Sequence, residues 1–289
     1  MYPEILRIGD FVITSFGLMM FLSFLGAAWI TGKQLERYGM AKEIAWDILA
    51  WIAIGGILGA KIYFLILNYR QVMADPSLLY SRGGLVWYGG FIGGVTALFL
   101  QARAKNLPLA TMYDANAPGL ALGYAIGRLG CFLVGDDYGR YTEGPFGVAF
   151  PKGAPESTAG NLRSLFGEEI PAHIPDSAVV TVHPTQLYEI GLALIMLSVL
   201  WRLGRERGLK AGQLFAVYLA MYGVERFMIE FVRAKSDRVL FGLSTSQLAS
   251  IAMLLLAAFL WWRQGQKGKP TPLVTPGSAR PRPAPARAG

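Results

Sequence analysis

Charged residues are scarce in this chain. They make up 16% of its 289 residues, whereas a soluble domain carries about a quarter. The deficit is concentrated in long apolar runs, which excludes an ordinary soluble protein and predicts an integral membrane protein. The formal net charge is +8, and the basic residues gather in loops and in the C-terminal tail. Charge placed in this way is typical of segments that face the cytoplasm, so we expect no nucleic-acid partner.

Cysteine and histidine are also rare. Cys131 is the single cysteine, which excludes an intrachain disulfide and a cysteine-based metal cluster. His173 and His183 are the only histidines, too few for a histidine-rich metal site. We therefore expect no metal site in this protein.

Seven apolar runs are long enough to cross a membrane as helices, because about 20 residues at about 1.5 Å each span a hydrocarbon core of about 30 Å. Gly55, Gly56 and Gly59 in the second run predict close helix packing. The glycines of residues 82–94 predict the same, with backbone access to a ligand as the alternative. The sequence thus predicts an all-α integral membrane protein with seven transmembrane helices. The expected spans are residues 11–30, 44–68, 82–105, 113–134, 183–201, 214–232 and 245–262.

Two stretches fall outside the apolar runs. Residues 135–182 are rich in proline, glycine and acidic residues; they are too polar to span, and they predict a small head or a lid over a site. The tail is rich in Gly, Pro, Ala and Arg, which predicts a disordered basic segment attracted to anionic lipid. The expected domains are a membrane domain of residues 1–263 and a tail of residues 264–289.

Lysine and arginine are unevenly divided between the two sets of loops. They are more numerous in residues 33–42, 103–105, 202–210 and beyond 263 than in the alternate loops. The positive-inside rule then places the C-terminus in the cytoplasm and, with seven spans, the N-terminus outside. This orientation brings the 82–94 turn, the 135–140 turn, HPTQLYE (183–189) and the end of the sixth span to the outer side.

An arginine in the middle of an apolar helix is the most informative single residue. Arg128 lies among Ala125, Ile126 and Leu129, and a guanidinium is costly in hydrocarbon unless it faces a polar cavity or a partner. Gly127 beside it leaves room for an anionic head group near the backbone. Alternatively, Arg128 snorkels to the interface or pairs with an acid for packing.

Further charged residues share the outer side with Arg128. Arg226 and Glu230 stand four residues apart and therefore on one face of a helix. Arginine suits phosphate because its planar fork donates two parallel hydrogen bonds and keeps its charge. Neighbouring carboxylates would orient the guanidinium or accept a proton. An ion pair that only supports packing is the alternative. The candidate set also contains Arg140, Arg233, Asp136, Asp137, Glu189, His183, Tyr188 and Tyr88.

Four motifs in combination resemble one family. They are GGLVWYGGFIGG, GRLGCFLVGDDYGR, HPTQLYE and RFMIEFVRAKSD. From about residue 16 to the seventh span, the chain is similar to bacterial phosphatidylglycerol–prolipoprotein diacylglyceryl transferases. The resemblance implies a seven-helix enzyme of the bacterial inner membrane with a small periplasmic head. It implies transfer of the diacylglyceryl group of phosphatidylglycerol to the lipobox cysteine of a prolipoprotein signal peptide, giving a thioether and glycerol phosphate. No metal or nucleotide cofactor is implied.

The resemblance also assigns roles to matching residues. Arg128 and Arg226 would stabilise the charge of the leaving phosphate. The thiol must lose its proton before attack, and Tyr88 stands where the family presents a histidine proposed as the base. A phenol, with a pKa near 10, needs nearby arginines to serve as a base at neutral pH. The expected catalytic residues are Arg128, Arg226, Tyr88 and Glu230. The expected phosphatidylglycerol-binding residues are Arg128, Arg226, Gly127, Asp136, Arg140, His183, Gln186, Tyr188, Glu189 and Arg233.

Several positions depart from the family pattern. Phe16 stands for a tyrosine, Cys131 and Val134 for asparagines, and Asp136 for a glutamate. Because the substrate supplies the thiol, Cys131 is interpreted as a small packing residue rather than a covalent nucleophile. The departures leave two alternatives: a diverged relative acting on another phospholipid or acceptor, or a lipid-binding or transport protein without catalysis. A transporter is expected to show internal repeats, and the sequence shows no convincing one.

Overall fold

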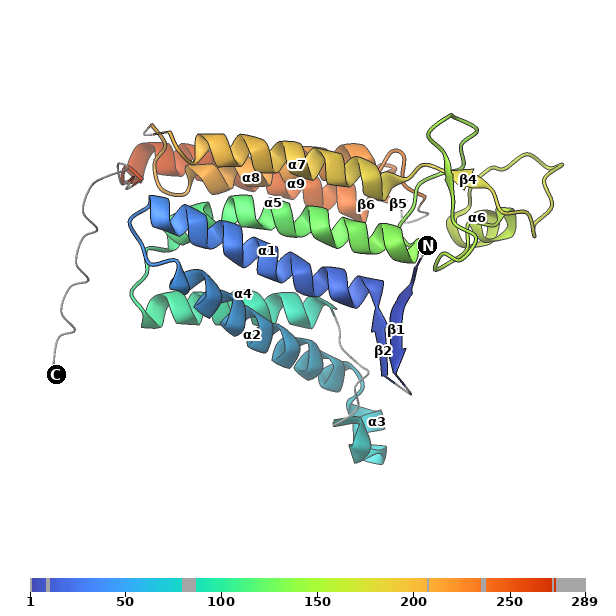
Figure 1. Ribbon diagram of the computed structural model, residues 1–289, viewed down its shortest axis with the longest axis horizontal. Coiled ribbons are helices and arrows are strands. Elements are labelled where there is room, and N and C mark those ends of the chain that lie inside the picture. Colours follow the sequence, from blue (N-terminus) through green and yellow to red (C-terminus); the bar gives the residue numbers. More distant parts are fainter. Residues whose placement is uncertain are drawn as a thin grey trace.

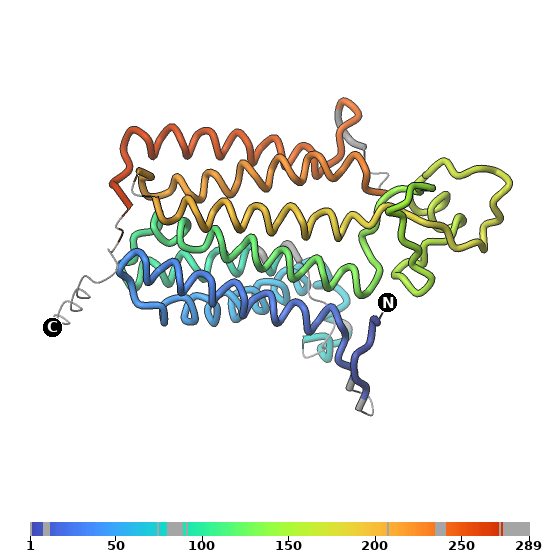
Figure 2. Tube along the Cα trace, turned by 45° about the horizontal axis from the view of Figure 1, so that its top comes forward, coloured from blue at the N-terminus to red at the C-terminus, as the bar shows by residue number. Residues whose placement is uncertain are grey.

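Within the described residues, seven helices of 17 or more residues dominate the structure. The computed structural model describes residues 2–8, 11–79, 87–206, 208–234, 238–271 and 273. Figures 1 and 2 show the long helices running side by side, with a smaller unit containing α6 at one end. The long helices are α1 (Ser15–Arg37), α2 (Glu43–Leu67), α4 (Trp87–Ala104), α5 (Leu109–Val134), α7 (Thr185–Leu203), α8 (Gln213–Ile229) and α9 (Thr245–Lys267).

Short elements extend or connect these helices. The strands form three antiparallel two-stranded ladders, β1–β2, β3–β4 and β5–β6, so the helices carry the fold. The short helices are α3 (Tyr69–Ala74), the 3-10 helix η1 (Pro76–Leu79) and α6 (Ala159–Phe166). The strands are β1 (Glu4–Ile8), β2 (Phe11–Thr14), β3 (Val148–Ala149), β4 (Thr181–Val182), β5 (Arg238–Leu240) and β6 (Leu243–Ser244).

The outer surface of the helices is apolar. Within the described residues, α1, α2, α5, α7 and α9 are long and apolar enough to cross a membrane, and at most 39% of each apolar stretch is buried. On α2, for example, Trp51, Ile57 and Leu58 are each more than half exposed. An apolar surface of this extent is unfavourable in water and favourable in hydrocarbon. The predicted class, a helical integral membrane protein, is therefore confirmed.

Both ends of the membrane region differ from the expected boundaries. Residues 11–14, expected to open the first span, form β2 and pair with β1. Their β-branched Val12, Ile13 and Thr14 favour a strand, and α1 begins only at Ser15, where the Thr14 hydroxyl accepts a hydrogen bond from the Gly17 N–H at 3.1 Å. At the other end α9 continues to Lys267, past the expected boundary at 263. Residues 274–289 of the predicted tail lie outside the described residues.

Glycines bring α2 and α4 into close contact. A Cβ atom added at Gly59 would overlap the carbonyl oxygen of Gly89 and lie 2.8 Å from the Cα of Gly93, and one added at Gly55 would lie 2.7 Å from the Gly93 oxygen. The two backbones therefore touch with no side chain between them, as small residues allow in membranes. Close packing predicted from these glycines is confirmed, although Gly56 lies at an ordinary contact distance.

The segment 135–182 folds as a compact unit at one end of the bundle (Figure 1). Its core is built from buried apolar side chains of α6, the β3–β4 ladder and the loops between them. The Thr158 side chain caps α6 at its N-terminus, and Gly167 ends that helix in the left-handed conformation. We call this unit the head. Its buried core comprises Tyr138, Phe150, Ala159, Leu162, Ile170, Val180 and Val182, with Ala234 from beyond α8.

A matched pair of substitutions tests the α2–α4 contact. Gly59→Ala forces a methyl group into the Gly89 backbone, whereas a Cβ at Gly56 would lie 3.6 Å from the Gly90 oxygen. We expect Gly59→Ala to lower the free energy of unfolding in detergent by about 1–3 kcal/mol, and Gly56→Ala to lower it much less. Equal thermal midpoints for the two variants would contradict the packing described.

Candidate active site

Two arginines from different helices meet at one buried carboxylate. Glu189 in α7 has no exposed surface. Its Oε1 atom lies 3.0 Å from Nη2 of Arg128 in α5 and 3.3 Å from Nη1 of Arg226 in α8. Both arginine side chains are largely buried, with exposures of 12% and 11%. A carboxylate without exposed surface is tolerated only where cations and donors compensate it, so this contact joins three helices.

Each arginine has a further carboxylate partner. Nη2 of Arg226 lies 3.2 Å from Oε2 of Glu230, which confirms that these two residues share a helix face. Nη1 of Arg128 lies 3.0 Å from Oδ2 of Asp137, whose other oxygen pairs with Arg233. We call this connected set the arginine network. It brings together Arg128, Arg226, Arg233, Glu189, Glu230 and Asp137.

Two residues beside the network, Tyr124 and Glu225, were not in the set expected from the sequence. The Tyr124 hydroxyl lies 2.8 Å from Oε1 of Glu189 and 3.2 Å from Oε1 of Glu225, and the Arg128 guanidinium lies 5.4 Å from the Tyr124 ring centre. Helical spacing could have indicated Tyr124, which precedes Arg128 by four residues. Glu225 gives no such signal, since it directly precedes Arg226 and adjacent helical residues point in different directions.

The turn after α5 places Asp137 beside the arginines. Gly135 and Asp137 adopt φ angles of 77° and 59°, left-handed values that glycine and aspartate tolerate best. The Thr185 hydroxyl donates to the main-chain oxygen of Asp137 at 2.8 Å, and Nε2 of Gln186 donates to that of Asp136 at 2.5 Å. Both donors are fully buried, so the first turn of α7 holds this turn in place.

A backbone ladder ties the same turn to two further helix ends. The Gly139 N–H donates to the His183 oxygen at 2.8 Å, and the His183 and Arg140 N–H groups donate at 2.9 Å to the oxygens of Arg140 and Val232. A Cβ atom at Gly139 would lie 2.5 Å from the Val232 oxygen, so only glycine fits. The end of α5, the start of α7 and the end of α8 are therefore fastened together beside the arginine network.

Three predicted binding residues make contacts outside the network. Nδ1 of His183 lies 3.2 Å from the Tyr188 hydroxyl. Nε of Arg140 lies 3.5 Å from Oε1 of Glu168 in the head. In the described part of the chain, neither His183 nor Arg140 forms an ion pair with a carboxylate of the arginine network. These side-chain contacts thus lie within the head, for Arg140, and at the start of α7, for His183 and Tyr188.

A Cβ atom at Gly127 would meet no atom within 4 Å, so the helix surface is open at this position. Whether a head group binds there stays a prediction. Tyr88 belongs to the first turn of α4, but its side chain lies outside the described part of the structure. Its role as a base stays a prediction.

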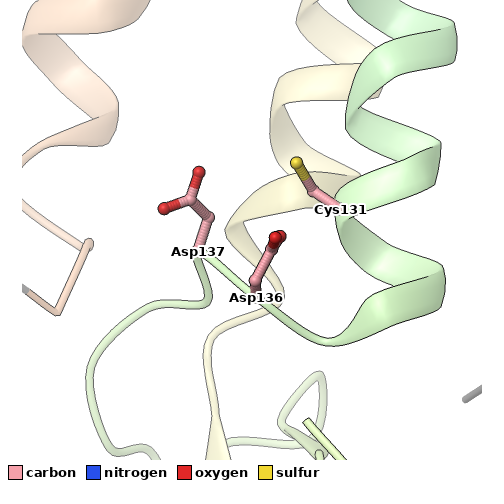
Figure 3. Close-up of side chains that lie close together, drawn as sticks. All are labelled: Cys131, Asp136 and Asp137. Atoms are coloured by element: carbon pink, nitrogen blue, oxygen red, sulfur yellow. The ribbon is translucent and has the colours of Figure 1, made fainter. Parts of the chain in front are cut away.

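Cys131, Asp136 and Asp137 lie close together at the end of α5 (Figure 3). One ligand atom from each lies within 4.8 Å of the others, a spacing that could suit a metal ion. However, both Asp137 oxygens already pair with arginines, one with Arg128 and the other with Arg233. The positive charges of these arginines oppose the binding of a metal cation. Burial also raises the pKa of Asp136, which weakens it as a ligand. We interpret the group as the edge of the arginine network, in which the buried Cys131 serves for packing.

Four buried oxygens of the site have no donor among the described residues. A buried acceptor without a donor costs free energy, and a water molecule or a ligand can supply the missing donor. Glu189 is the clearest case, because its two oxygens differ. Its Oε1 atom contacts Tyr124, Arg128 and Arg226, whereas its Oε2 atom has no donor among the described residues. The four atoms are Oε2 of Glu189, Oε1 of Glu230, Oε1 of Gln186 and Oδ1 of Asp136.

Comparison with known proteins decides the family. A model of the prolipoprotein diacylglyceryl transferase family matches residues 3–263. The chain belongs to this family. A phosphatidylglycerol–prolipoprotein diacylglyceryl transferase of Clostridium tetani is 31% identical over 263 residues, 90% of this chain and 97% of the relative. Proteins of the same name from Aeromonas hydrophila and Vibrio cholerae are each 30% identical and cover 90% and 89% of this chain, in both cases over 89% of the relative. The predicted family and enzyme class are confirmed.

The charge of Asp137 gives the site a testable pH dependence. Burial raises the pKa of Asp137, but the charges of Arg233 and Arg128 outweigh burial and hold that pKa below its usual range. A depressed pKa stabilises the folded protein above the unfolded value of about 4, and this contribution is lost as the pH falls through the folded value. We therefore expect Asp137→Asn to have a lower thermal midpoint than wild type at neutral pH, and the difference to shrink below about pH 4. Melting curves in detergent measure this, and a constant difference across that range would disprove it.

Proposed function

We propose that this chain transfers the diacylglyceryl group of phosphatidylglycerol to the lipobox cysteine thiol of prolipoproteins. The names of its relatives state phosphatidylglycerol and prolipoprotein for those proteins. The observation that supports the proposal in this chain is the pair of guanidinium groups of Arg128 and Arg226, which share one oxygen of Glu189. Two converging guanidinium groups fit one phosphodiester, since each donates parallel hydrogen bonds to its oxygens.

The reaction exchanges one bond at the glyceryl carbon that bears the phosphate. The acceptor sulfur bonds to this carbon, the bond from carbon to phosphate oxygen breaks, and its electron pair leaves with glycerol phosphate. The thiol proton passes to a base and then to the phosphate product or water. Negative charge grows on the phosphate in the transition state, so Arg128 and Arg226 lower the barrier by binding that charge more tightly there. Glu189 and Glu230 keep both guanidinium groups oriented.

The head group of phosphatidylglycerol matches the free acceptors of the site. Its terminal glycerol carries two hydroxyl groups, and each can donate to a buried oxygen that lacks a donor. Oε2 of Glu189 and Oε1 of Glu230 are such oxygens, and both residues contact the proposed phosphate-binding arginines. We therefore assign the glycerol end of the lipid to this side of the network, with Gln186 and Asp136 as further acceptors.

Three side chains are candidates for the base that takes the thiol proton. Tyr88 stands at the position of the family's histidine, and an arginine close to a phenol favours its ionised form. Glu230 offers a free carboxylate oxygen. His183 borders the network and carries an imidazole, the side chain most often used for general acid–base catalysis.

The proposed setting is the bacterial inner membrane, crossed by all seven long helices. The arginine network and the head lie at one end of the bundle, whereas the basic residues of 33–42 and 202–210 follow the ends of α1 and α7 at the other (Figure 1). By the positive-inside rule, the head, the network and the N-terminus face the periplasm, and the basic residues 264–289 form a cytoplasmic tail. Both lipid and signal peptide then reach the site from the bilayer.

Removing either arginine tests the proposed function. We expect the wild-type gene to rescue a bacterial strain depleted of its diacylglyceryl transferase, and Arg128→Ala or Arg226→Ala to reduce transfer to a lipobox peptide by about 100-fold or more. Arg128→Lys keeps the positive charge but lacks the planar guanidinium that donates two parallel hydrogen bonds. It should retain less than a tenth of the activity, because the loss of one hydrogen bond to a charged group reduces the rate by roughly that factor. The measurement is incorporation of labelled diacylglyceryl from phosphatidylglycerol vesicles.

Lys33→Ala is the control, because Lys33 is a half-exposed cation of α1 whose partner is Glu36. It should transfer at the wild-type rate. Wild-type protein that reaches the membrane and transfers nothing would favour a non-catalytic lipid-binding protein. Transfer from another phospholipid but not from phosphatidylglycerol would favour a diverged relative, the alternative suggested by the departures at Phe16, Cys131 and Tyr88.

Tyr88→Phe tests the assignment of the base. If the Tyr88 phenol takes the thiol proton, its removal should lower kcat by about 100-fold at neutral pH with little change in KM for the lipid. His183→Gln and Glu230→Gln are assayed in parallel. If Tyr88→Phe keeps full activity, Tyr88 is not the base, and a loss of kcat in one of these two variants would assign the role to His183 or Glu230.

A further inference from the structure

The Tyr124 hydroxyl lies between two buried carboxyl groups. Its oxygen is 2.8 Å from Oε1 of Glu189 and 3.2 Å from Oε1 of Glu225. Glu189 is fully buried and Glu225 is 5% exposed. A phenol has a single proton to donate, and the shorter distance assigns that proton to Glu189. The contact between Tyr124 and Glu225 then lacks a hydrogen unless Glu225 supplies it.

Glu225 is also an acid without a cationic partner. Among the described residues, no lysine or arginine nitrogen lies within 4.0 Å of it. The carboxylates of the arginine network itself are balanced by arginines one for one, whereas Asp136 at its edge, like Glu225, forms no ion pair in the described part of the chain. An ionised Glu225 would therefore add an unbalanced negative charge, which would repel an anionic phosphodiester. The balanced groups are Arg128, Arg226 and Arg233 with Glu189, Glu230 and Asp137.

The groups around Glu225 are mainly aromatic and acidic. The Tyr222 ring packs edge-on against Tyr124 with the ring centres 5.3 Å apart, and Tyr218 stacks on Tyr222 at 6.0 Å. Such surroundings solvate a neutral carboxylic acid better than a carboxylate. The titratable and charged groups that act on Glu225 are Tyr124 and Arg128 from α5, Glu189 from α7, and Tyr218, Tyr222 and Arg226 from α8.

We propose that Glu225 carries a proton and is a positioning residue of the transferase site: its carboxylic acid donates to the Tyr124 oxygen, and Tyr124 in turn donates to Glu189. This inference rests on the function proposed above and adds a residue to it. With the proton in place, each hydrogen of the chain has an acceptor. Glu189 stays ionised, with Oε1 directed at Tyr124 and the arginines and with Oε2 left for the substrate.

Without that proton, the two carboxylates would compete for the hydroxyl of Tyr124. Glu189 would lose a donor whenever the hydroxyl turned to Glu225, and Arg128 and Arg226 would lose their fixed partner. The arginines would then be poorly aligned for the leaving phosphate, although both would remain present. Glu225 thus acts through Tyr124 and Glu189 rather than by touching the lipid.

Infrared spectroscopy tests the proton directly and needs no turnover. Wild-type protein in lipid nanodiscs at neutral pH should show the C=O stretch of a protonated carboxylic acid, and the difference spectrum against Glu225→Gln should isolate that band. In Tyr124→Phe the band should persist at a higher frequency, because its hydrogen-bond acceptor is gone. A wild-type spectrum identical to that of Glu225→Gln in this region would overturn the proposal, whatever the enzyme's activity.

Kinetics test the positioning role. Glu225→Ala should lower kcat by about tenfold, the equivalent of one hydrogen bond to a charged group, and Glu225→Gln, whose amide can donate to Tyr124, should recover most of that loss. Wild-type activity should fall at alkaline pH as Glu225 loses its proton, and Glu225→Gln should lack this fall. Equal activities of the Ala and Gln variants, or an alkaline limb unchanged in Glu225→Gln, would refute the role. An inactive wild-type enzyme with the infrared band present would instead refute the proposed function alone.

Discussion

Glu189 has no contact with solvent, and its negative charge is met by Arg128 and Arg226 from two other helices. Burying a lone carboxylate costs several kcal/mol, and breaking a buried pair by removing one partner costs about 3–5 kcal/mol. The relative positions of α5, α7 and α8 are therefore coupled to the electrostatics of this single contact. The other parts of the site are arranged around this contact. Glu230 pairs with Arg226 and Asp137 pairs with Arg128, and the Tyr124 hydroxyl donates a hydrogen bond to the oxygen of Glu189 that both arginines share.

The membrane explains why such a contact can be stable and useful at once. In hydrocarbon an arginine needs a partner, and an acid on a neighbouring helix supplies it without exposing either group. In the function proposed above, the same arginines bind the phosphate of the lipid. Outside this polar interior the helices present apolar side chains to the bilayer, and α2 and α4 meet through bare glycine backbone.

Periodicity and composition predicted much of the fold, because apolar runs of about 20 residues have few alternatives to a membrane helix. The pairing of Arg226 with Glu230 was also accessible, since a spacing of four fixes a shared face. The contact of Glu225 with Tyr124 could not be predicted from the sequence, because the two residues are about a hundred positions apart and only tertiary packing brings them together. Likewise the contact of Arg140 with Glu168 of the head joins residues 28 positions apart, which helical spacing does not predict. The strand at residues 11–14 was read as helix because its apolar residues fit both structures.

The ladder through Gly139 couples three helix ends to one another. Because backbone hydrogen bonds join Gly139 to His183 and Arg140 to Val232, the turn that bears Asp137 cannot shift unless the end of α5, the start of α7 and the end of α8 shift with it. Asp137 also pairs with Arg128 and Arg233, so a disturbance of this turn would reach both guanidinium groups at once.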